Sequence, residues 1–67
     1  MDSNALRAEI ARKGFTLPKI AEAIGIGKKA MYEKLSGKTE FKRSEMKALK
    51  DVLDISDEKV TEIFFAE

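Results

Sequence analysis

Apolar side chains recur along the chain at intervals of three and four residues, which is the spacing of one face of an α-helix. Glycine, proline and polar residues interrupt this pattern repeatedly, and no stretch shows the sustained alternation that indicates a β-strand. The pattern predicts five short helices: one over about 3–13, one between Thr16 and Gly25, one over Lys28–Ser36, one over Arg43–Asp54 and one capped by Ser56. The sequence therefore predicts a single compact all-α domain over 1–67, with tight turns and near-perpendicular helix packing.

Local signals predict where these helices begin and end. Thr16 and Ser56 are good N-cap residues, because their hydroxyl oxygens can accept a hydrogen bond from an N–H group of the first turn. Gly25 is expected to end the second helix, since glycine adopts the left-handed backbone conformation without strain. Phe41, within a polar loop, is expected to enter the core.

Charge is distributed unevenly along the chain. The net charge of the 67 residues is only +1, but residues 12–43 carry nine basic and three acidic side chains. Residues 44–67 carry three basic and seven acidic side chains. A basic centre followed by an acidic tail indicates one strongly charged surface.

Composition excludes several classes of function. The chain has no cysteine and no histidine, which removes thiolate chemistry, cysteine-ligated zinc and the commonest general base. Gly25 and Gly27-Lys28 do not make a nucleotide-binding loop, because Glu22 and Lys29 stand where that loop needs glycine and Ser or Thr. The start of the chain is not a secretory signal, and no apolar run could span a membrane. We therefore expect a cytoplasmic protein that is not an enzyme and has no cofactor, metal, small-molecule substrate or membrane partner.

The segment at about 16–37 has the arrangement of a helix-turn-helix. Two short helices meet across Gly25-Ile26-Gly27, and Ala21, four residues before Gly25, lets the helices approach closely. The apolar wedge between the helices is expected to consist of Ile20, Ile24, Ile26, Met31 and Leu35.

Ala21, Gly25, Ile26 and Met31 have the spacing of the helix-turn-helix of the phage lambda repressor/Cro superfamily, which this chain resembles over about residues 4–65. The stretch Lys34-Leu35-Ser36-Gly37-Lys38 is similar to the end of that family's recognition helix. The resemblance implies a sequence-specific DNA-binding transcriptional regulator with its third helix in the major groove. One departure is Leu17-Pro18, where many members have a glutamine that contacts phosphate, and Lys19 could replace that contact.

The candidate DNA contacts follow from this placement. With Met31 and Leu35 facing inward, the opposite face of the third helix presents Lys29, Tyr32, Glu33 and Ser36. The predicted base contacts are Lys28, Lys29, Ala30, Tyr32 and Glu33, and the predicted backbone contacts are Lys19, Ser36, Lys38, Lys42 and Arg43. Clustering with Lys34 gives residues 28–43 six basic and two acidic side chains, which favours phosphate contacts.

Alternatives remain open at several of these residues. Lys28 and Lys29 are either base contacts or an ordinary solvated pair. Glu33 either accepts from cytosine or pairs with Lys29 on the helix surface. Tyr32 either contacts DNA or packs half-buried.

The last helix raises the question of partners. Phe64 fits its inner stripe, so Phe65 lies about 100° away and is either exposed or part of a dimer interface. We expect a symmetric homodimer on a pseudo-palindromic operator, with third helices about 34 Å apart. The alternative is a protein-binding helix-turn-helix module, antirepressor-like or antitoxin-like, without strong DNA binding. Its working surface would be Phe65 and the acidic segment 44–67.

Overall fold

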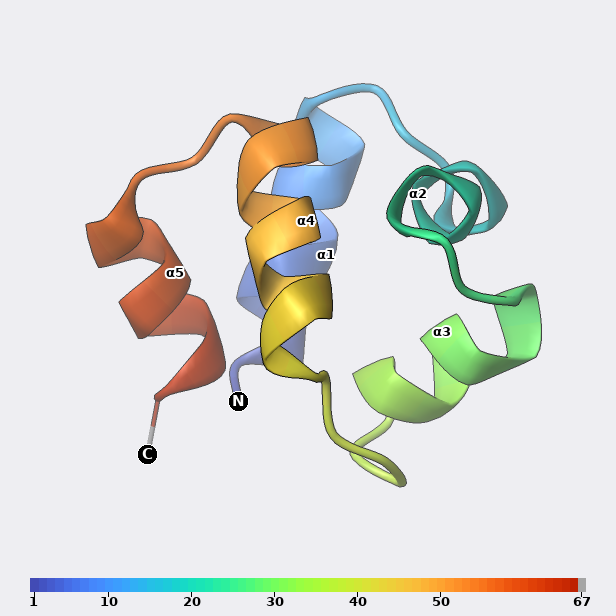
Figure 1. Cartoon of the computed structure of the whole chain (residues 1–67). Coiled ribbons are helices and arrows are strands. Elements are labelled where there is room, and N and C mark those ends of the chain that lie inside the picture. The colour runs from blue at the N-terminus through green and yellow to red at the C-terminus, as the bar shows by residue number, and fades with distance from the viewer. Residues whose placement is uncertain (67) are drawn as a thin grey trace.

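Five helices follow one another in the computed structural model, which describes residues 1–66 (Figure 1). They are α1 (Ser3–Arg12), α2 (Leu17–Ile24), α3 (Lys28–Leu35), α4 (Arg43–Leu53) and α5 (Asp57–Phe64). This part of the chain contains no strand, so the predicted all-α fold is confirmed. The first, third and fourth helices each end one residue earlier than predicted. None of the helices in these 66 residues has the length and hydropathy needed to cross a membrane.

The predicted caps are confirmed. Thr16 Oγ1 accepts a hydrogen bond from the Lys19 N–H at 3.3 Å, and Ser56 Oγ accepts one from the Lys59 N–H at 3.1 Å. Gly25 ends α2 in the left-handed conformation, with φ of 81°. These signals are local, because each depends on residues no more than four apart, and this explains why the sequence reveals them.

The helices surround one apolar core. In Figure 1, α1 and α4 run up the page, α2 is seen end-on, and α3 and α5 flank α4 on opposite sides. Every helix contributes to the core, whose most deeply buried large side chains are Leu6, Ile10, Ile20, Met31, Leu49, Leu53 and Ile63. Phe41 is buried as predicted, and its ring meets that of Phe64 edge-on with centroids 5.5 Å apart. The loop before α4 is thereby joined to the end of α5.

Candidate nucleic-acid interface

The turn between α2 and α3 brings the two helices into close contact. The Ile26 N–H donates to the Ala21 carbonyl at 2.9 Å and closes the end of α2. Ala21 is almost completely buried, and α2 packs against both α3 and α4. Gly27 has extended backbone angles and precedes the first residue of α3. Two short helices and the tight turn between them therefore stand at the expected residues.

The outer face of α3 is open to solvent. Met31 and Leu35 are buried, whereas Lys28 and Lys29 are exposed at the start of the helix. Tyr32 is 43% exposed, so it is close to half-buried, and both interpretations of this residue, a DNA contact and packing, stay open. Ala30 is partly buried at the edge of this face. A flat partner could therefore meet the first turn of α3 without rearrangement of the core.

The lysines at the start of α3 are not neutralised by neighbouring carboxylates. Within residues 1–66, neither Lys28 nor Lys29 forms an ion pair. Glu33 is paired, but its partner is Lys38 at 3.4 Å and not Lys29, the partner in one of its two alternatives. The reason is that the loop after α3 folds back over the last turn, where Lys38 donates its backbone N–H to the Glu33 carbonyl at 3.0 Å.

Lys34 does not belong to the exposed basic cluster in which the sequence interpretation placed it. Only 8% of this residue is exposed. Its Nζ lies 3.0 Å from Glu45 Oε1 on α4, donates to the Glu40 carbonyl at 3.0 Å, and lies 5.9 Å from the centroid of the Phe41 ring. The charge of Lys34 is therefore used within the fold, because α4 places a carboxylate opposite it.

Glu45 has two roles at this contact. Its Oε1 also accepts the Lys42 backbone N–H at 2.8 Å, half of a capping box at the start of α4. Burial alone would raise the pKa of Glu45, but this hydrogen bond and the nearby charges of Lys34 and Lys42 outweigh burial and hold the pKa below its ordinary value of 4.5. The carboxylate is therefore ionised at neutral pH. The sequence contained one signal for it, a glutamate three residues after the cap position.

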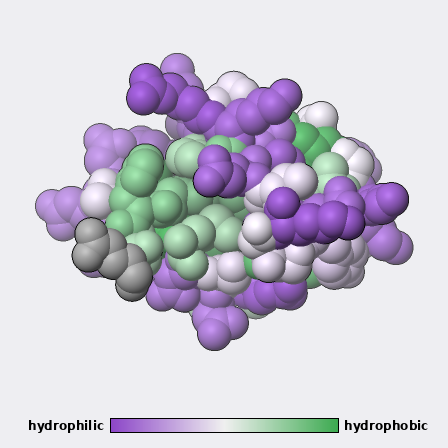
Figure 2. Space-filling model, turned by 90° about the horizontal axis from the view of Figure 1, so that it is seen from below, coloured by the Kyte–Doolittle hydropathy of each residue, from purple (hydrophilic) through white to green (hydrophobic). Residues whose placement is uncertain are grey.

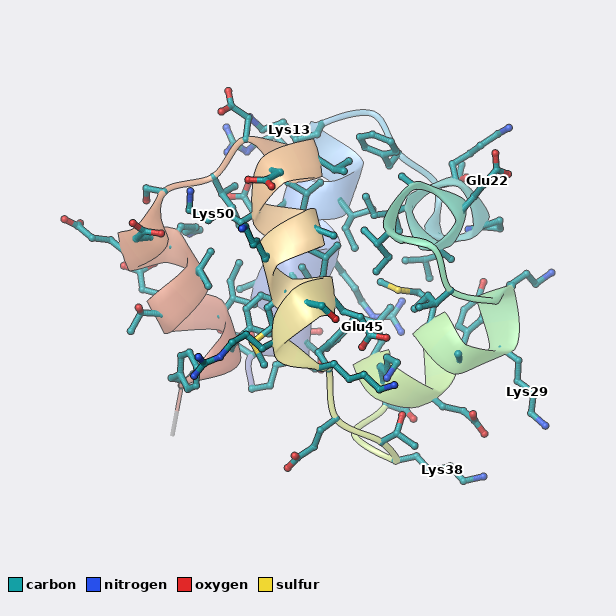
Figure 3. All side chains as sticks on the ribbon, in the orientation of Figure 1. Lys13, Glu22, Lys29, Lys38, Glu45 and Lys50 are labelled. Atoms are coloured by element: carbon teal, nitrogen blue, oxygen red, sulfur yellow. The ribbon has the colours of Figure 1, made fainter. Side chains whose placement is uncertain are left out.

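The predicted backbone contacts do not all share one face, because Arg43 lies at a hollow between α4 and α5. Lys19 on α2, Ser36 at the end of α3 and Lys38 in the following loop are exposed on the α2–α3 side. In Figure 3, Lys29 and Lys38 project outward from the same end of the molecule, away from Lys13. Ser36 Oγ donates to the Glu33 carbonyl at 2.9 Å, so its hydroxyl closes the last turn of α3.

Lys42 and Arg43 stand at the start of α4, and both are exposed. Arg43 lines a hollow between α4 and α5 together with Lys47, Asp57 and Phe65. The structure thus brings Arg43 together with the predicted dimer residue rather than with Lys38.

An apolar area lies beside the end of α5, and its hollow reaches Lys34 at the end of α3 and the loop that follows. Phe65 caps α5 and is 65% exposed, and Met1 beside it is 42% exposed. Both line a hollow of about 390 Å³ that Met46 and Phe64 share. Figure 2 shows a continuous hydrophobic area, bordered by hydrophilic side chains, on the face seen from below. Phe65 therefore faces solvent in a single chain, which agrees with both predicted alternatives, simple exposure and a dimer interface.

The side chains that could bind metal are dispersed. Among residues 1–66, no three Asp or Glu side chains gather as a metal site would require. The exposed residues described above form the candidate site, a surface of lysines, a tyrosine and a serine on α2, α3 and the segment after α3.

Comparisons with known proteins place the chain in a family. Neither the search of curated proteins nor the search of solved structures found a match. One family matches the chain over residues 1–67, and its description is "Protein of unknown function (DUF739)". Since this match covers the whole chain, the protein belongs to the DUF739 family.

Proposed function

We propose that the protein is a sequence-specific regulator that binds double-stranded DNA with α3 in the major groove. The observation that carries the proposal is the uncovered first turn of α3, where Lys28 and Lys29 have no carboxylate partner among the described residues. Lysine can donate to guanine O6 and N7, and residues near the N-terminal end of a recognition helix reach base edges. Tyr32, exposed one turn later, is in position to meet a thymine methyl group or a phosphate.

Phosphate contacts would come from the edges of this face. Lys19 on α2 and Lys42 before α4 are exposed and unpaired within residues 1–66, whereas Lys38 shares its charge with Glu33. Few free cations on one subunit imply modest affinity for any DNA sequence. A second subunit would supply the remaining affinity.

The proposed dimer interface is the apolar area around Phe65. In Figure 1, α3 and α5 lie on opposite sides of α4, so pairing through α5 leaves both α3 helices uncovered. Successive major grooves on one DNA face are about 34 Å apart, which requires each α3 to lie roughly 17 Å from the two-fold axis. That distance fits within a domain whose longest extent is 26 Å.

The test is binding to labelled DNA at low salt, with three lysine variants compared. Fragments enriched by the protein from a random pool provide the specific duplex, and a random-sequence duplex provides the reference. Lys28→Ala is expected to weaken binding to the enriched duplex by about 1–3 kcal/mol and to leave binding to the random duplex almost unchanged. Lys42→Ala is expected to weaken both and to reduce the salt slope by about 1. Lys13→Ala, an exposed lysine far from Lys29 in Figure 3, is the control and should change neither.

Two results would contradict the proposal. Equal loss on both duplexes for Lys28→Ala would remove its role as a base contact. No binding of the random duplex at about 50 mM salt would remove DNA binding altogether, since non-specific contacts dominate there. The latter result would favour the alternative, a protein-binding helix-turn-helix module that works through Phe65 and the acidic segment 44–67.

A further inference from the structure

The C-terminal end of α3 is held by two contacts from distant parts of the sequence. Ser3 Oγ, in the first turn of α1, donates to the Leu35 carbonyl at 2.7 Å. Lys34 Nζ meets Glu45 Oε1 of α4 at 3.0 Å. The start of α3 is fixed to α2 by the tight turn, so these two contacts determine how its other end is placed.

The Lys34–Glu45 ion pair is largely shielded from solvent, and each partner makes a further hydrogen bond. Each side chain is only about a tenth exposed, at 10% for Lys34 and 11% for Glu45. The ammonium also donates to the Glu40 carbonyl, and the carboxylate also accepts the Lys42 N–H. Three segments, namely the end of α3, the loop and the start of α4, therefore meet at one ion pair. Figure 3 shows Glu45 directed from α4 toward α3.

Hydrogen bonds and ion pairs restrict orientation in a way that apolar packing does not. Apolar cores keep stability through many rearrangements, whereas a hydrogen bond tolerates only a few tenths of an ångström and a limited angle. A buried ion pair contributes little net stability compared with an apolar pair of the same shape. An orienting role explains a pair at this location better than a stabilising one does.

We propose that Ser3, Lys34 and Glu45 form a clamp that sets the angle at which α3 meets DNA. The three are positioning residues, because Lys34 is buried, the Glu45 side chain is only 11% exposed, and none of the three is on the exposed first turn of α3. The inference rests on the proposed function. Base contacts depend on the angle of α3, since they require hydrogen-bond geometry, whereas flexible lysines reach phosphates over a range of angles.

The test uses neutral replacements of nearly the same shape. Lys34→Met with Glu45→Gln removes both charges together, keeps an unbranched apolar side chain at position 34 and keeps an acceptor for the Lys42 N–H. Ser3→Ala removes the other contact without changing any charge. The control makes the corresponding neutral replacements at a more exposed ion pair between α4 and α5, Lys50→Met with Asp57→Asn, in which Lys50 Nζ lies 3.6 Å from Asp57 Oδ1.

Binding is measured by fluorescence anisotropy on the duplex enriched by the wild-type protein and on a random-sequence duplex. The Lys34/Glu45 double variant is expected to bind the enriched duplex about tenfold or more weakly, while its affinity for the random duplex and its salt slope stay unchanged. Ser3→Ala is also expected to weaken binding to the enriched duplex, by a smaller factor. The control should match the wild type on both duplexes.

Each contrary result has a separate meaning. Wild-type affinity of both clamp variants for the enriched duplex would overturn the clamp and leave the proposed function intact. Equal loss on both duplexes would also overturn it, because the residues would then act on charge or folding rather than on orientation. A wild-type protein that binds neither duplex would overturn the proposed function and the clamp together. Circular dichroism establishes that each variant is folded, and if the double variant is not, Ser3→Ala decides the question.

Discussion

Replacement of Lys34 alone is expected to destabilise the fold severely. The methionine of Lys34→Met keeps most of the side-chain volume but leaves the Glu45 carboxylate, 11% exposed, without its cation. At 3.0 Å the lost attraction is about 5.5 kcal/mol at an effective dielectric constant of about 20. Part of this loss is offset, because the desolvation cost of the ammonium also disappears. Breaking one partner of a buried pair costs about 3–5 kcal/mol.

A loss of this size is large compared with the total stability. A chain of 67 residues is expected to have a free energy of unfolding of roughly 3–10 kcal/mol. Lys34→Met should therefore be marginally folded or unfolded at room temperature and neutral pH. The double variant with Glu45→Gln should recover most of the loss, since it leaves no buried charge unpaired and keeps the hydrogen bond to the Lys42 N–H.

Urea unfolding followed by far-ultraviolet circular dichroism measures these differences. With a slope of about 1 kcal/mol per molar urea, a loss of 3 kcal/mol moves the midpoint by about 3 M. A shift of less than about 1 M for Lys34→Met would refute the reasoning, because the pair would then behave as a solvated surface pair. A double variant as unstable as Lys34→Met would also refute it, since the cost would not come from an unpaired charge.

Four further predictions concern Phe65, Glu45 and the two glycines of the turn between α2 and α3. Phe65→Ser is expected to shift the protein toward monomer in sedimentation at micromolar concentration, and an unchanged oligomeric state would remove Phe65 from the interface. The lowered pKa of Glu45 contributes stability that is complete above the ordinary value of 4.5 and is lost as pH falls through the lowered pKa. The difference in urea midpoint between wild type and Glu45→Gln should therefore shrink on acidification, and a constant difference from pH 7 to pH 3 would contradict this. Gly25→Ala should lower the free energy of unfolding by about 1–2 kcal/mol, because alanine is strained at the φ of 81°. No steric clash adds to this cost, because a Cβ at this position would have no atom within 4 Å. Gly27→Ser should instead raise the melting temperature, because α3 has no side-chain cap and Gly27 has N-cap backbone angles.

The fold was predictable because its signals are local. Thr16, Gly25 and Ser56 act within one helical turn, so their roles are visible without knowledge of the tertiary structure. The inward placement of Met31 and Leu35 follows from helical periodicity alone.

The electrostatic part of the site was less predictable, because it depends on which helix lies opposite. Lys34 is buried only because α4 places Glu45 against it, eleven positions away in the sequence. Glu9 is buried for a similar reason, since α5 brings Lys59 to 4.0 Å from its carboxylate while Arg12 pairs with it at 2.7 Å. Periodicity assigns both residues to helix surfaces and contains no signal for the partner. Arg43 is different, because Lys47 and Lys50 follow it at helical spacing and indicate one shared face of α4.

The ion pairs reduce the number of free cations in the basic centre of the chain, residues 12–43. Residues 12–43 carry nine basic side chains in sequence, but Lys34 is neutralised by Glu45 and Lys38 by Glu33. The exposed, unpaired cations on or beside the α2–α3 face within the described chain are Lys19, Lys28, Lys29 and Lys42. At about 0.9 per phosphate contact, four such cations give one subunit a salt slope of about 4 at most. Under the proposed function, a subunit with so few phosphate contacts gains little affinity by charge alone, so the proposal requires the rest to come from base contacts by a correctly oriented α3 and from the pairing of two subunits.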